Sequence, residues 1–139
     1  MQRLLLTLCF SILFAANPAA YAADLTITVN NVKSDKGQIR ITLYNQSAKW
    51  LKLGYKRVLA PAATGTVSAV FSNLPSGEYA VALFHDEDSD EKMAKNLIGI
   101  PTEPVGFSND ARGTFGPPAF DAVKLNLEQD NKTISITLF

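Results

Sequence analysis

The chain has 139 residues, the length of about one domain, with 13 basic residues, 13 acidic residues and 47% apolar residues. This composition excludes an intrinsically disordered chain, which needs fewer apolar residues and a larger net charge. Without a basic excess the chain also lacks the charge that nucleic-acid-binding proteins carry.

Residues 1–22 have the features of a secretory signal peptide. Arg3 is their one charge, a long apolar run follows it, and Ala20 and Ala22 have the small-x-small spacing that signal peptidases accept. We predict cleavage after Ala22, which leaves one mature domain, residues 23–139, in the periplasm or outside the cell. The mature sequence has no cysteine and no apolar run long enough for a transmembrane helix.

Six stretches of the mature chain alternate in side-chain type with a period of two, which is typical of β-strands. The stretches are 25–30, 39–44, 67–72, 79–84, 123–128 and 134–139. They predict an all-β fold, a single antiparallel β-sandwich of about seven to eight strands. The residues expected in or near its core are Leu25, Ile27, Ile41, Phe71, Tyr79, Val81, Leu125 and Ile136.

Three other segments carry structural signals. Residues 48–59 fit a helix face and a strand equally well, although Gly54 weakens the helix, and no other segment predicts a helix. The turn before Gly77 predicts a positive φ at this glycine, so that Gly77→Val would destabilise the fold. Residues 99–120 contain four glycines and four prolines, which predicts a long loop packed against the sandwich.

The sharpest local feature is the acidic run from His85 to Glu91, where five of seven residues are acidic. Alternating carboxylates can converge on a hard cation such as Ca²⁺, and the candidate ligands are Asp86, Asp88 and Asp90. An EF-hand loop needs glycine in sixth place and glutamate in twelfth, where this chain has Glu91 and Leu97. A weak calcium site and a solvated acidic turn therefore both fit the pattern.

His85, Glu103 and Asn109 are candidate binding residues near this run, because the long loop can fold back onto it. Catalysis by His85 would need a nucleophile or an orienting partner, and the adjacent Asp86 points to the opposite face of a strand. We therefore favour a non-enzymatic module that binds or supports a partner at its acidic-loop end, and the candidate partners are a protein or a component of the cell envelope. The alternative is a periplasmic enzyme with metal- or carboxylate-assisted chemistry that uses His85, Asp86 and Glu103.

Basic residues are concentrated in residues 33–57, which hold seven of them and one acid, Asp35. Some of them surround Trp50 and Tyr55. Such a stretch can contact an anionic surface, compensate the charge of the acidic run, or form an ordinary solvated strand.

The run NLPSGEYAVALFHDEDSD, followed by NLIGIPTEPVGFSNDARGTFGPPAFDAVKLNL, resembles the bacterial exported proteins grouped as domain of unknown function 2141. The resemblance covers essentially the whole mature chain. It implies an immunoglobulin-like or prealbumin-like sandwich similar to carboxypeptidase regulatory domains, and the family has no established activity. Its members usually continue the acidic run as Asn-Gly-x-x-Asp, which is similar to a calcium loop, whereas residues 90–94 here read Asp-Glu-Lys-Met-Ala.

The residues that match the family pattern are Pro75, Gly77, Tyr79, Ala80, His85, Asp86, Gly99, Ile100, Pro101, Glu103, Gly106, Phe107, Ser108, Asn109, Gly116, Pro117, Pro118 and Phe120.

Overall fold

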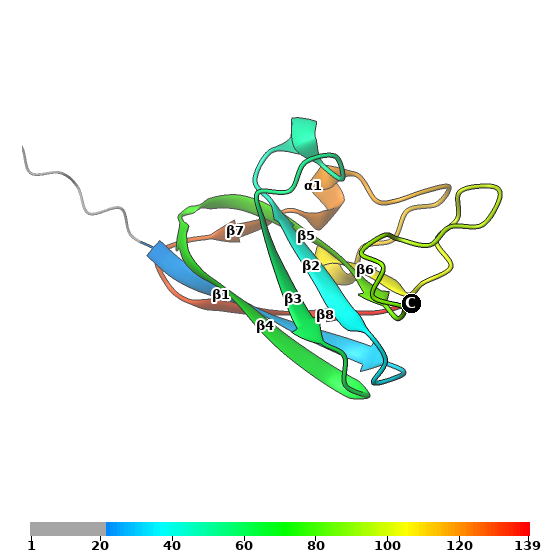
Figure 1. Ribbon diagram of the computed structural model, residues 1–139. Helices are drawn as coiled ribbons and strands as arrows, with labels where there is room; N and C mark the ends of the chain where they lie inside the picture. Colours follow the sequence, from blue (N-terminus) through cyan, green and yellow to red (C-terminus); the bar gives the residue numbers. More distant parts are fainter. Residues whose placement is uncertain (1–21) are drawn as a thin grey trace, which may run out of the picture.

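The computed structural model describes residues 22–139 (Figure 1), so all of the predicted signal peptide except Ala22 lies outside the described residues. The elements in chain order are β1 (Ala22–Val32), β2 (Gln38–Tyr44), η1 (Ser47–Lys49), β3 (Lys56–Pro61), β4 (Gly65–Pro75), β5 (Gly77–Asp86), β6 (Val105–Phe107), η2 (Ser108–Asp110), α1 (Phe120–Val123), β7 (Leu125–Leu127) and β8 (Lys132–Thr137). None of the helices within residues 22–139 is long and apolar enough to cross a membrane.

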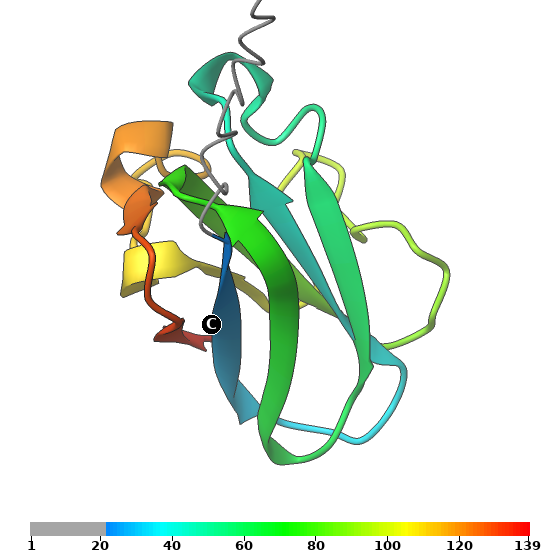
Figure 2. The same ribbon diagram turned by 90° about the vertical axis from the view of Figure 1, so that its left-hand side faces the viewer.

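The strands form two sheets, seen from two directions in Figures 1 and 2. The first has the order β4-β1-β8 and the second the order β3-β2-β5-β6, with β7 also paired to β5. The inner faces of both sheets contribute to one apolar core. All eight residues expected there are buried, the least buried being Leu125 at 7% exposure. The period-two pattern therefore predicted the core correctly.

The prediction of purely antiparallel sheets is wrong, because β8 pairs with β1 in parallel, from Leu25 opposite Lys132 to Asn30 opposite Thr137. The reason lies in the preceding element. β7 belongs to the other sheet, where it pairs with β5. The chain crosses between the sheets after β7 and enters β8 beside the early part of β1, so that both strands run the same way.

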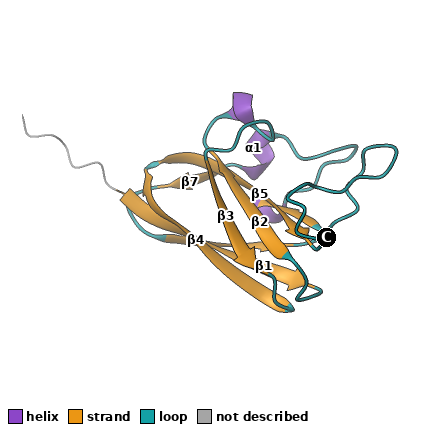
Figure 3. Cartoon of the chain, viewed as in Figure 1, coloured by secondary structure: helices purple, strands orange, loops and turns teal. Residues whose placement is uncertain are grey.

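Hydrogen bonds connect the two sheets at the edge formed by β6. The amides and carbonyls of Val105 and Phe139 are joined by reciprocal hydrogen bonds of 3.1 and 3.0 Å. Gly106 allows this close approach, because a Cβ there would lie 2.8 Å from Cγ2 of Ile136. The chain terminus thus lies beside β6, at the end of the sheets where the long loops gather (Figures 1 and 3).

Three segments differ from the expected elements. The ambiguous residues 48–59 form the end of η1 and most of β3. The Pro/Gly-rich residues 99–120 contain β6 and η2 as well as loop. The expected strand at 123–128 is shortened to Leu125–Leu127, because α1, a helix that the sequence did not predict, ends at Val123.

The outer face of the second sheet is covered by a second apolar cluster. Its buried members are Tyr44, Ala80, Val105, Phe107 and Val123, and Trp50, Met93 and Phe120 are among the side chains packed on it. Trp50 also donates a hydrogen bond from Nε1 to the carbonyl of Pro118 at 2.9 Å. The second sheet is therefore covered on both faces, by the core inside and by loop residues outside.

The prediction for Gly77 is wrong. Its φ is not positive, and a Cβ there would meet nothing closer than Cε2 of Tyr79 at 3.9 Å. The neighbouring turn is closed by Tyr79 instead, whose hydroxyl donates to the carbonyl of Pro75 at 2.7 Å. A nearby glycine that the backbone does require is Gly37, which has φ +67° and whose Cβ would overlap the carbonyl oxygen of Asp86.

We predict that Gly37→Ala lowers the free energy of unfolding by about 1–3 kcal/mol or more. The left-handed backbone and the close approach of Asp86 both make a side chain at this position unfavourable. Gly77→Ala serves as the matched control and should change stability by no more than about 0.5 kcal/mol. Urea unfolding of both variants measures the difference. Equal stabilities of the two variants would contradict this assignment.

Candidate functional site

The acidic run forms a loop that begins at a buried carboxylate. Asp86, the last residue of β5, is 0% exposed. One of its oxygens accepts the amide of Asp90 at 3.2 Å, and the other accepts the amide of Glu91 at 3.1 Å and Nε2 of Gln38 at 3.0 Å. Asp86 therefore attaches the start of the loop to the neighbouring strand β2.

These hydrogen bonds determine the ionisation of Asp86. Its burial would raise the pKa, since desolvation disfavours the charged form. The hydrogen bonds from Gln38, Glu91 and Asp90, and the contact with Asp88, together outweigh this effect and lower the pKa below its usual value. Asp86 is thus a charged acceptor at neutral pH.

Glu103 plays a similar role at the other end of the loop. Its carboxylate accepts the amide of Glu87 at 3.2 Å through one oxygen and the amide of Ala94 at 3.0 Å through the other. Because these two amides lie on opposite arms of the loop, Glu103 holds the arms together.

The structure brings two of the three predicted metal ligands, Asp86 and Asp88, close to Glu103, which was predicted as a binding residue. Oxygens of Asp86, Asp88 and Glu103 lie within 4.8 Å of one another, and Asp90 is not part of this group. Asp90 instead accepts the amide of Lys92 at 2.7 Å. The third carboxylate therefore comes from the returning arm of the loop and not from the alternating aspartates of the acidic run. The group offers the hard oxygen donors that Ca²⁺ takes as ligands.

His85 and Asp86 do not form a joint site. His85 is 0% exposed and its Nε2 lies 2.7 Å from the carbonyl of Lys36, while its Nδ1 is buried without a hydrogen-bond partner among the described residues. The side chain of Asp86 bonds toward Gln38 and the acidic loop, as successive residues of a strand require.

The side-chain amide of Asn109 donates its hydrogen bonds to residues outside the acidic loop. Its Nδ2 donates to the carbonyls of Ala122 and Lys124, at 3.1 and 3.0 Å. The adjacent Ser108 is also buried and bonds both Val81 and Val123. The Gly-Phe-Ser-Asn motif therefore connects η2 to β5 and to the segment around α1.

One basic residue of the 33–57 segment faces the acidic loop. Nη1 of Arg40 lies 3.4 Å from Oε2 of Glu91, close enough for an ion pair but without hydrogen-bond geometry. The side chain of Arg40 is 7% exposed and that of Glu91 is 66% exposed. The guanidinium of Arg40 also lies 5.9 Å from the ring centroid of Phe84.

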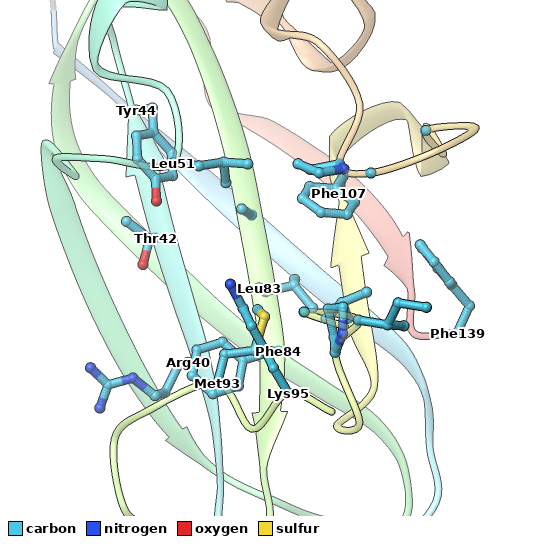
Figure 4. A pocket seen from close by; sticks show the side chains of 18 of the residues that line it. Arg40, Thr42, Tyr44, Leu51, Leu83, Phe84, Met93, Lys95, Phe107 and Phe139 are labelled. Carbon is cyan, nitrogen blue, oxygen red and sulfur yellow. The ribbon is translucent and has the colours of Figure 1, made fainter. Parts of the chain in front are cut away.

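A cavity of about 860 Å³ lies over the outer face of the second sheet. Its floor comes from β2, β5 and β6, and its walls come from the loop after β5 and the loop before α1 (Figure 4). The lining is mixed, with three cationic residues, one acid and many apolar side chains. Residues of its floor and walls include Arg40, Thr42, Arg57, Ala82, Phe84, Glu91, Met93, Lys95, Ile98, Val105, Phe107 and Phe115.

No sequence pattern predicted this cavity or its residues Arg40, Met93 and Lys95. The period-two pattern of residues 39–44 predicts Arg40 on the face opposite the core, yet this residue is 6% exposed. A signal was present in residues 79–84, which read Tyr-Ala-Val-Ala-Leu-Phe and are apolar on both faces. Continuous apolar strands are typical of sheets covered on both sides.

The fold and site define a two-sheet β protein whose second sheet carries an acidic loop and a cavity on its outer face. The chain belongs to the bacterial family described as uncharacterized proteins conserved in bacteria, DUF2141, whose sequence profile matches residues 27–135. No curated protein and no solved structure matches the chain.

We predict that Asp86→Asn destabilises the protein by about 1–3 kcal/mol at neutral pH, because an amide nitrogen cannot accept the hydrogen bonds that the buried carboxylate accepts. Since the pKa of Asp86 is lowered by folding, its contribution is present above about pH 4 and is lost as pH falls through the folded-state pKa. The stability difference between wild type and variant should therefore shrink in acid.

Urea unfolding as a function of pH measures this difference. Asp130→Asn is the control, since Asp130 is exposed and should show neither the loss at neutral pH nor the pH dependence. A difference between wild type and Asp86→Asn that stays constant down to pH 2 would contradict the assigned role.

Proposed function

We propose that this chain is an exported, non-enzymatic binding module built on an immunoglobulin-like or prealbumin-like sandwich, and that its ligand occupies the cavity on the outer face of the second sheet. The volume of about 860 Å³ carries the proposal, because small-molecule sites have about 300–1,000 Å³. The signal-peptide features of residues 1–22 support export to the periplasm or the medium.

The positions of the polar residues favour binding over catalysis. An enzyme using His85, Asp86 and Glu103 would need these groups to converge on one concave space. His85 bonds the β1–β2 turn, Asp86 and Glu103 bond loop amides, and none of the three lines the cavity. The polar residues that do line it, among them Arg40, Arg57 and Lys95, are suited to hold a ligand.

Occupancy of the cavity can be tested with the dye 8-anilinonaphthalene-1-sulfonate, whose fluorescence rises in apolar surroundings. We predict that Ala82→Trp abolishes the rise, because Ala82 lies on the cavity floor and a large side chain there fills the space. Val70→Trp is the matched control, since Val70 is 45% exposed on β4 of the other sheet.

Circular dichroism verifies that both variants are folded. The dye should show no rise in fluorescence with Ala82→Trp, and the same rise with Val70→Trp as with wild type. Equal fluorescence in all three proteins, or none in wild type, would contradict the proposed function.

A second proposed function is weak calcium binding by Asp86, Asp88 and Glu103. The observation that favours it is the convergence of these three carboxylates within 4.8 Å. All three already accept backbone amides, and the chain lacks the glycine and the twelfth-position glutamate of strong calcium loops. We therefore expect a dissociation constant on the order of 10⁻⁴–10⁻³ M, as in extracellular calcium modules.

Millimolar Ca²⁺ should then raise the melting temperature, because a ligand that binds the folded state alone stabilises it by mass action. Asp88→Asn should remove this rise while leaving the buried Asp86 in place. Asp90→Asn removes the same charge from the same loop but lies outside the carboxylate group, so the rise should persist. Thermal unfolding with about 10 mM calcium measures the effect. No rise in wild type, or equal losses in both variants, would rule the site out.

A further inference from the structure

We propose that the ligand of the outer-face cavity is a small amphipathic carboxylate, with its apolar part between the sheet and the loops and its anionic head at Lys95 and Arg57. This inference rests on the proposed function, which assigns binding to the cavity without specifying the ligand.

The charges around the cavity favour an anion. Arg40, Arg57 and Lys95 line it, and Glu91 is the acidic residue among the lining side chains of the described chain. The cavity therefore has an excess of positive charge although the protein as a whole is neutral. A cavity with low-dielectric walls strengthens such a local field.

Lys95 is the best placed of these cations to meet a ligand. Figure 4 shows its side chain extending from the loop after β5 toward the middle of the cavity. Its backbone lies next to the arm that Glu103 fixes through the amide of Ala94. Among the interactions of residues 22–139, Nζ of Lys95 has neither an ion-pair partner nor a hydrogen-bond acceptor. A lysine over an apolar space without a partner is suited to receive an anion.

The other two cations are partly engaged at the cavity edge. Arg57 donates a long hydrogen bond of 3.4 Å from Nε to Oγ1 of Thr42, which leaves its terminal nitrogens for a ligand. Arg40 faces Glu91, whose exposed carboxylate already occupies an anion position at the rim. Glu91 therefore repels an incoming anion, and its removal should favour binding.

The rest of the lining is suited to an apolar chain. The floor presents Ala82, Phe84 and Phe107, and Met93 adds a flexible thioether above it. At the mouth Ile98 and Phe115 are 79% and 103% exposed, an unusual exposure for side chains of this size. A ligand with an anionic head group and an apolar chain matches this lining better than an inorganic anion does.

Three eight-carbon probes that differ in head group test the proposal: octanoate, 1-octanol and octyltrimethylammonium, titrated at neutral pH and followed by amide chemical shifts. We expect octanoate to bind most tightly, with shifts at Ala82, Met93 and Lys95. Lys95→Gln should weaken octanoate about threefold to fivefold, the range of a partly exposed ion pair, and leave 1-octanol unchanged. Glu91→Gln should strengthen octanoate binding.

Lys52→Gln is the matched control. It removes a positive charge from an exposed residue that follows Leu51 of the lining but does not itself line the cavity, and should leave all three affinities unchanged. Losses equal to those of Lys95→Gln would show a general charge effect and overturn the proposal.

Equal binding of octanoate and 1-octanol would also overturn the proposed ligand class, while the binding function of the cavity would stand. No binding of any octyl probe or of the fluorescent dye would remove both. Sedimentation with phosphatidylglycerol vesicles in the absence of octanoate binding would assign the exposed apolar loop to a membrane surface and overturn the small-ligand proposal.

Discussion

The buried carboxylate of Asp86 organises the end of the molecule at which the proposed site lies. Where β5 ends, the chain leaves the ladder, and its next amides lose their strand partners. Asp86 accepts two of these amides and is itself fixed to β2 by Gln38. Because a charged acceptor makes strong hydrogen bonds, one side chain compensates for two lost backbone bonds and turns the loop over the outer face of the sheet.

The remaining features of the cavity depend on this loop. Glu103 joins its two arms, and the residues on either side of Ala94, Met93 and Lys95, contribute to the cavity wall. Gly37 allows the β1–β2 turn to lie directly against the backbone of Asp86. The acidic run, whose carboxylates would otherwise repel one another, is thus neutralised in part by amide donors and by Arg40.

The core could be read from the sequence because alternation reports which face of a strand is buried, and Leu25, Ile41 and Val81 all lie where it placed them. The covered outer face of the second sheet could not be predicted in this way. Polar side chains such as Arg40 and Thr42 are typical of a solvated face, and only the positions of the covering loops show otherwise. The parallel pairing of β8 was missed for a similar reason. It depends on the chain crossing between the sheets after β7, a long-range choice that leaves no local pattern.

In the candidate site, the structure brings Asp86 and Asp88, which the sequence assigned to one group, close to Glu103, which was expected to fold back onto them. It expected Asn109 in the same place, but the amide of Asn109 bonds Ala122 and Lys124. An amide side chain is an equally good partner for a backbone carbonyl and for a ligand, so its role follows from loop geometry and not from residue type.

Amide hydrogen exchange in the acidic loop tests the central role of Asp86 most directly. If its carboxylate organises the loop, the amides of Asp90 and Glu91 should exchange slowly at neutral pH although both residues are exposed. Leu97, at the exposed tip of the same loop, should exchange at the rate of an unprotected amide. Rates for Asp90 and Glu91 as fast as that of Leu97 would show that Asp86 does not hold the loop, and would contradict the account of the cavity.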